Sequence, residues 1–196
     1  AALAQEPDVS MVQIAVASVL FATRDYQRSL DLLAEVSAKG GNAARHATDL
    51  ALDMAGALGW DHDVRAILEA ALEASPKDGK RHAQACRFYA SARHWQKALD
   101  HGEAAVAAKP KAGALLMEVA GLHARRDHRS EASAMVRRAL QHIDEAGPVG
   151  AAAFRLEAAR VAIDASDFAL ALEQLERVTE LSPKDPAPWV QMGEIH

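Results

Sequence analysis

Several residue types are scarce in this chain of 196 residues, and each scarcity excludes a class of protein. A single cysteine, Cys86, excludes an internal disulfide framework and any metal site built from several cysteines. Val, Ile and Thr together number only 21 and aromatic residues make up 5%, which is too few for a sheet-rich protein. No apolar run approaches the roughly 20 residues of a membrane-spanning helix, so we expect no direct membrane insertion.

Alanine is the residue type present in excess. The chain has 45 alanines, half of its residues are apolar and a quarter are charged. Alanine is the best helix former, so this composition predicts an all-α protein with enough apolar side chains for a core. The net charge of −5 argues against a mainly electrostatic grip on nucleic acid.

An internal repeat organises the sequence. A turn is followed by an aromatic residue and, three residues later, by a small one at Tyr26 and Ser29, Trp95 and Ala98, and Phe168 and Ala171. With two weaker copies, units begin at residues 10, 45, 79, 113, 152 and 186, at spacings of 35, 34, 34, 39 and 34 residues. A fixed period of this length is typical of helical repeat arrays. The longest interval contains the Gly- and Pro-bearing stretch 144–150, which predicts a lengthened loop.

Each unit contains two helical patterns separated by a short turn. In the third unit, His82, Ala85, Cys86 and Tyr89 recur at i, i+3, i+4 and i+7, the stripe of an amphipathic helix, and Pro110 ends the second helix. Small residues occupy one slot of the first helix (Ala17, Cys86, Ala120, Ala159 and Gly193) and one of the second (Ser29, Ala98, Ala132 and Ala171). Small side chains let two helix backbones approach closely, so these slots predict tightly packed antiparallel pairs.

The sequence resembles the tetratricopeptide repeat (TPR) family. Trp189, Met192 and Gly193 match the opening of the family pattern, and Ala98, Ala105 and Pro110 match its second helix. Polar residues stand where a bulky apolar residue is common, at Gln13, Thr48, His82 and Arg155. The resemblance implies a right-handed α-α superhelix with TPR units at 10–44, 45–78, 79–112, 113–151 (with the lengthened loop) and 152–185.

We expect the chain to be part of a longer bacterial array. Residues 1–9 fit the end of a preceding repeat and residues 186–196 the start of a further one. A competing interpretation takes Ala2-Leu3-Ala4 before Gln5 as what remains of a secretory cleavage site. The compartment, cytoplasmic or periplasmic, and the oligomeric state therefore stay open.

No motif nominates a catalytic centre, so we predict a non-enzyme without cofactor or metal. Neither a dinucleotide-binding nor a phosphate-binding glycine motif is present. His82 and Cys86 are spaced i, i+4 and could share a metal, but both fall in helix-packing slots. The basic cluster 123–129 could hold a phosphate or an acidic peptide, but it spans the turn between two helices, and a solvated turn is the favoured interpretation.

In TPR proteins the first helices line a concave face, where ligands usually lie. Carried over by position, this resemblance places peptide-binding residues at Ile14, Phe21, Asp49, Asp53, Lys80, Arg87, Met117, Arg125, Leu156 and Arg160, with Ala114 and Gly121 among their neighbours. Residues 45–78 contain three basic and seven acidic residues, whereas residues 79–112 contain seven basic and two acidic ones. Such patterning suits an extended peptide that bears charge of both signs, and solvated charge on the helix faces explains it equally well.

The leading functional prediction is a non-catalytic scaffold that binds a protein or an extended peptide. The alternative is a docking segment of a larger bacterial polysaccharide synthesis or secretion protein, linked to a glycosyltransferase or an outer-membrane exporter. RNA binding by the related pentatricopeptide design is disfavoured by the negative net charge. The single asparagine, Asn42, argues against the asparagine-based carboxylate clamp of chaperone-docking TPR proteins.

Overall fold

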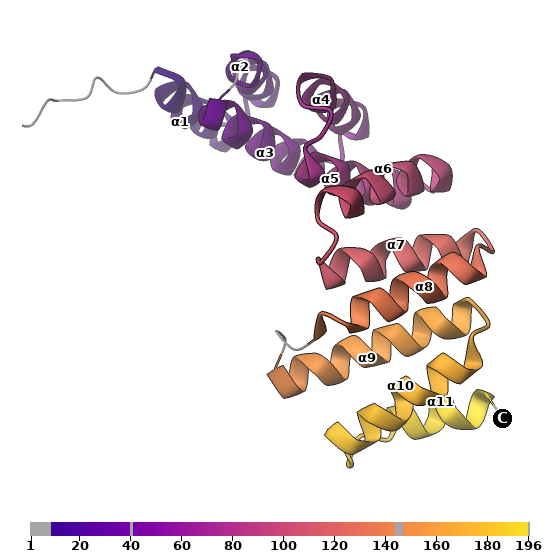
Figure 1. Cartoon of the computed structure of the whole chain (residues 1–196). Coiled ribbons are helices and arrows are strands. Elements are labelled where there is room, and N and C mark those ends of the chain that lie inside the picture. The colour runs from indigo at the N-terminus through magenta and orange to yellow at the C-terminus, as the bar shows by residue number, and fades with distance from the viewer. Residues whose placement is uncertain (1–8, 40, 144–146, 196) are drawn as a thin grey trace, which may run out of the picture. The chain divides into compact units, whose positions relative to one another are not determined.

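The computed structural model describes residues 9–39, 41–143 and 147–195, and these form α-helices without any strand (Figure 1). The helices are α1 (Val9–Ala22), α2 (Tyr26–Ala38), α3 (Gly41–Leu58), α4 (Asp61–Ala74), α5 (Gly79–Ser91), α6 (Trp95–Ala108), α7 (Gly113–Arg125), α8 (Arg129–Leu140), α9 (Gly147–Asp164), α10 (Phe168–Leu181) and α11 (Ala187–Ile195). They group into two compact units, one up to Pro76 and one from Lys77 onward.

Within each unit, odd-numbered helices pack antiparallel against the even-numbered helices that follow them. The first unit consists of α1–α2 and α3–α4, and the second of α5–α6, α7–α8 and α9–α10, with α11 packed on α10. Successive pairs also contact each other, through α2 and α3 in the first unit and through α6 and α7 in the second. Each pair therefore buries its apolar stripe partly against its own partner and partly against its neighbours.

The turns inside the five pairs share one backbone geometry. One residue of each turn has a positive φ: Arg24, Gly59, Arg93, Asp127 and Ser166. The next N–H bonds to a carbonyl five residues earlier, as from Asp167 to Ala162 at 2.8 Å and from His94 to Tyr89 at 2.8 Å. The N–H of the positive-φ residue itself bonds to a carbonyl three residues earlier, as from Ser166 to Ile163 at 2.8 Å. These two hydrogen bonds form the Schellman motif, which satisfies the last carbonyls of a helix and reverses the chain.

Small side chains form the contact between paired helices. Ala17, Ser29, Cys86, Ala98, Ala120, Ala132, Ala159 and Ala171 are all fully buried, whereas Gly193 is exposed. Glycines allow two further close approaches: a Cβ added at Gly79 of α5 would lie 2.5 Å from Cβ of Ala108 on α6, and one added at Gly102 of α6 would lie 2.8 Å from Cγ2 of Val119 on α7. The TPR pattern usually has a large residue at position 102, but here α7 leaves no room for a side chain.

Two helices begin earlier than the repeat period predicts. α3 begins at Gly41, whereas the period places the start of the unit at residue 45. The prediction of a loop over 144–150 is wrong in its second half, because α9 begins at Gly147. Residues 144–146 lie outside the described residues. A proline inside the first turn of a helix loses no hydrogen bond, so Pro148 is compatible with a helix that starts at Gly147.

Candidate functional site: a pocket between α7 and α9

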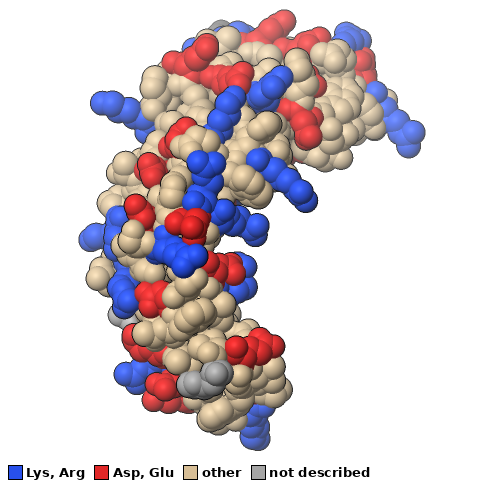
Figure 2. Space-filling view, turned by 90° about the vertical axis from the view of Figure 1, so that its right-hand side faces the viewer, with Lys and Arg blue, Asp and Glu red and all other residues tan. Residues whose placement is uncertain are grey.

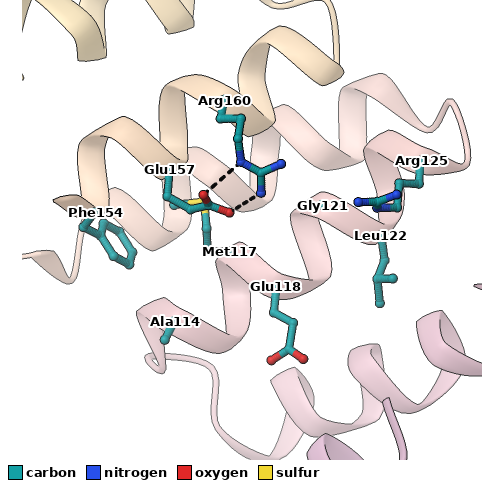
Figure 3. A pocket seen from close by; sticks show the side chains of 9 residues that line it. All are labelled: Ala114, Met117, Glu118, Gly121, Leu122, Arg125, Phe154, Glu157 and Arg160. Atoms are coloured by element: carbon teal, nitrogen blue, oxygen red, sulfur yellow. Dashed lines mark hydrogen bonds and ion pairs between the residues drawn. The ribbon is translucent and has the colours of Figure 1, made fainter. Parts of the chain in front are cut away.

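A pocket of about 390 Å³ lies between α7 and α9 in the second unit (Figure 3). Its lining residues come from these two helices alone: Ala114, Met117, Glu118, Gly121, Leu122, Arg125, Phe154, Glu157 and Arg160. A Cβ added at Gly113, at the start of α7, would lie 3.4 Å from Cζ of Phe154. The spacing 154, 157 and 160 places one face of α9 opposite α7.

The pocket combines an apolar floor with charged walls. Met117 and Leu122 are buried and Phe154 is half-buried, so they present apolar surface without projecting into solvent. In Figure 3 the Met117 side chain extends from α7 toward the pair formed by Glu157 and Arg160 on α9. An apolar side chain of a ligand could therefore be buried beside groups that recognise charge.

The Glu157–Arg160 pair is one of the charged walls. Arg160 Nε donates to Glu157 Oε2 at 3.0 Å, and a second bond joins Nη2 to Oε1. The hydrogen bond from Arg160 lowers the pKa of Glu157, and the same bond raises the pKa of Arg160, so both groups are charged at neutral pH. Both side chains are about half exposed, and such pairs stabilise a fold by only about 0–1 kcal/mol.

The opposite wall is held by α5 and α6. Arg87 Nε of α5 lies 3.1 Å from both carboxylate oxygens of Glu118. The guanidinium of Arg125 lies 5.4 Å from the ring centroid of Trp95 on α6, within the range of a cation–π contact. Neighbouring helices thus orient the two charged groups of α7 at the edge of the pocket. On the face shown in Figure 2, basic and acidic side chains are likewise intermingled.

The structure brings some of the predicted ligand-binding residues together. Met117, Arg125 and Arg160 line the pocket, and Arg87 contacts its wall through Glu118. Leu156 is half-buried but does not line the pocket, and Lys80 is exposed in the first turn of α5. Sequence reasoning missed Glu118, Leu122, Phe154 and Glu157. The i, i+3 pairing of Glu157 with Arg160 was the signal that could have found the α9 face.

The predicted residues of the first unit differ in their exposure. Ile14 is buried beside Ala17, with 4% of its surface exposed, because it packs α1 onto the core. It therefore offers almost no surface to a ligand, contrary to its assignment to the binding face. Phe21 is half-buried with its ring centroid 5.1 Å from that of Tyr26. Asp49 is half-buried and Asp53 is exposed on α3.

The candidate metal pair and the basic cluster have other contacts. Cys86 is fully buried, and burial raises the pKa of its thiol to about 12. His82 Nδ1 lies 3.0 Å from His101 Nδ1. No group of three or more metal-ligating side chains occurs within the residues that the structure describes. In the basic cluster, Arg126 donates to Gln96 at 2.9 Å and Arg129 to Asp127 at 2.6 Å.

Known proteins match this chain in fold but not in sequence. No family model and no curated protein sequence matches the chain. Solved structures do match the fold. One of them is YrrB, a TPR protein, which has a TM-score of 0.66 and 16% identity over 91% of this chain and 89% of its own. A tetratricopeptide repeat protein from Parabacteroides merdae has a TM-score of 0.71 and 13% identity over 95% of this chain and 72% of its own. MamA from Desulfovibrio magneticus RS-1, residues 41 to its end, has a TM-score of 0.67 and 14% identity over 92% and 99%.

The chain has the TPR fold. Its departures from the usual TPR pattern are explained by polar partners. Arg155 Nη1 donates to Gln174 Oε1 of α10 at 2.5 Å, and His82 of α5 meets His101 of α6, the same 19 residues apart. Lys39 Nζ donates to Gln13 Oε1 at 2.7 Å. A polar residue can occupy the apolar slot of a TPR helix when the facing helix supplies its hydrogen bond.

Thr48 completes the set of polar departures. Its hydroxyl donates to the Ala44 carbonyl at 2.8 Å and lies 3.1 Å from the Ser37 hydroxyl of α2.

The described part of the chain contains no helix that is both long and apolar enough to cross a membrane.

Proposed function

We propose that this chain is a non-catalytic protein-interaction scaffold that binds an extended peptide segment in the α7–α9 pocket. The observation that carries the proposal is the combination of an apolar floor, Met117 and Phe154, with carboxylates and guanidiniums on both walls. YrrB, one of the solved structures with this fold, is itself a TPR protein with an unusual peptide-binding site. The likeness of the two folds supports the proposal.

The chemistry of the walls indicates what kind of peptide fits. Glu118 and Glu157 would attract basic side chains, and Arg125 and Arg160 acidic ones. Because the Glu157–Arg160 pair is half exposed, a ligand carboxylate or guanidinium can exchange with one member at little cost in free energy. The preferred segment therefore has an apolar anchor residue flanked by charges of both signs.

A displayed library of random peptides tests the proposal without assuming any particular partner. Peptides selected on the chain should share an apolar residue with an acidic and a basic neighbour. Fluorescence polarisation of the selected peptides then measures affinity for two variants, Gly121→Phe and Gly56→Phe. An added Cβ meets nothing within 4 Å at either glycine, so the side chain can leave the backbone of both helices without a clash.

The two variants differ only in where the ring is placed. Gly121→Phe fills the pocket on α7 and should weaken binding by tenfold or more, whereas Gly56→Phe on α3 should leave affinity unchanged. Arg160→Glu should additionally select against peptides with an acidic neighbour. A library that yields no binder, or binders indifferent to Gly121→Phe, would show that this pocket is not a peptide site.

A further inference from the structure

One guanidinium that lines the α7–α9 pocket is not held by a carboxylate. Arg160 is hydrogen-bonded to Glu157 within the pocket. Arg125 contacts the face of the Trp95 ring and has no acidic partner within the residues that the structure describes. Its donors are therefore available to a carboxylate of a ligand, which a guanidinium can bind with two parallel hydrogen bonds.

Two further arginines lie beside Arg125, where the turns of neighbouring helix pairs meet. Arg126 donates to Gln96 of α6, and Arg93 lies in the turn just before Trp95, the first residue of α6. Both arginines are exposed, and neither has an acidic partner in the described part of the chain. The contacts of the end of α7 with α6 hold the two turns together. We call Arg93, Arg125 and Arg126 the basic edge.

The excess of positive charge is confined to two helix pairs of the second unit. Residues 77–143 contain 13 basic and six acidic residues, whereas residues 147–195 contain four basic and eight acidic ones. At the next turn, between α9 and α10, the charged residues are Asp164 and Asp167. The basic edge therefore favours a short anionic segment over a nucleic acid that runs along the array, since a long polyanion would meet repulsion at α9–α10.

The basic edge continues the pocket at one end. In Figure 3, Arg125 lies at the opposite end of the pocket from Phe154 and Ala114. Met117 and Arg125 are eight residues apart on α7, which corresponds to about 12 Å along the helix axis. An extended peptide covers that length with about four residues. A peptide whose apolar side chain contacts Met117 thus presents to Arg125 a residue about four positions away.

We propose that the peptide bound in this pocket carries an acidic tract on one side of its apolar anchor. An aspartate or glutamate about four residues from the anchor binds Arg125, and further acidic residues beyond it contact Arg93 and Arg126. The inference rests on the proposed peptide site and adds to it the charge of one flank, its distance from the anchor and the surface that binds it. Because the basic edge is exposed, its contribution to affinity should decrease as salt is added.

The peptides selected from the displayed library are the probes that test the proposal. They should share an acidic residue about four positions from the anchor. Replacing that residue by glutamine should weaken binding about tenfold in fluorescence polarisation, and Arg125→Gln should do the same. The two changes together should weaken binding no more than either alone, because both remove the same contact. Arg125→Lys keeps the charge and should restore part of the affinity.

A pair of double variants tests the rest of the basic edge. Arg93→Gln with Arg126→Gln should weaken binding at low salt and have little effect at high salt. Lys109→Gln with Lys111→Gln is the matched control, because it removes the same charge from exposed lysines in the turn before α7, at the other end of that helix. The control should leave the affinity unchanged. Circular dichroism establishes that every variant remains helical.

The outcomes separate this inference from the peptide site itself. Peptides that lose affinity for Gly121→Phe but not for Arg125→Gln would overturn the acidic tract and leave the peptide site standing. Peptides indifferent to both variants would overturn both proposals. A single-stranded RNA oligonucleotide that displaces the peptides and depends equally on Arg125 would show a nucleic-acid contact instead, which would also overturn the acidic peptide tract.

Discussion

Replacing Ser166 or Arg93 by glycine should stabilise the protein, because each holds a left-handed backbone conformation where a helix ends. Their φ angles are 61° and 59°, and both side chains are exposed. The equivalent turn after α3 already has glycine, Gly59, at φ 68°. The turn geometry itself therefore accepts glycine.

The size of the effect follows from two opposing contributions. The left-handed conformation costs an L-residue about 1–2 kcal/mol. Glycine loses more freedom on folding, which costs about 0.5–1 kcal/mol. The free energy of unfolding should thus rise by roughly 0.5–1 kcal/mol for each substitution. The two turns share no partner, so the effects of Ser166→Gly and Arg93→Gly should add.

Urea denaturation followed by circular dichroism measures the change as a shift of the midpoint at constant slope. Ala169→Gly is the matched control, because Ala169 is exposed and helical in α10, three residues from Ser166. There glycine should cost about 1 kcal/mol. If Ser166→Gly lowers the midpoint as Ala169→Gly does, the left-handed conformation at this turn carries no cost and the reasoning is refuted.

Two further predictions concern packing and pH. Gly102→Ala should destabilise the second unit by about 1–3 kcal/mol, since the new Cβ would lie 2.8 Å from Cγ2 of Val119. Gly56→Ala adds a Cβ in open space and should stabilise α3 by up to about 1 kcal/mol. Equal urea midpoints for the two variants would contradict the close approach of α6 to α7. Burial lowers the pKa of His101 and of His123, so the unfolded chain binds more protons in acid, and the urea midpoint should fall as the pH drops below about 6.5. The fall should be smaller for His101→Phe, and a midpoint that rises in acid would show the opposite sign.

The repeat period and the slots of small residues could be predicted from the sequence because they arise from local rules. Helix formation follows alanine content and apolar periodicity, and a turn must follow each stripe. Ala98, Ala120 and Ala171 are buried as the period predicts, since a fixed register returns the same residue to the same contact. The extent of α9 was less predictable, because a proline near a helix start and a proline in a loop look alike in sequence.

The sequence by itself determined the array of helix pairs, since every pair repeats the same local pattern of stripe, turn and small residue. Only the tertiary structure decided which polar residues meet, such as Arg155 with Gln174, and which side of α9 lines the pocket. It also showed that Val12 and Val16 of α1 are exposed although the corresponding residues of α7 are buried. Identical positions in a repeat differ in burial according to which helices surround them, and that depends on contacts between segments far apart in the chain.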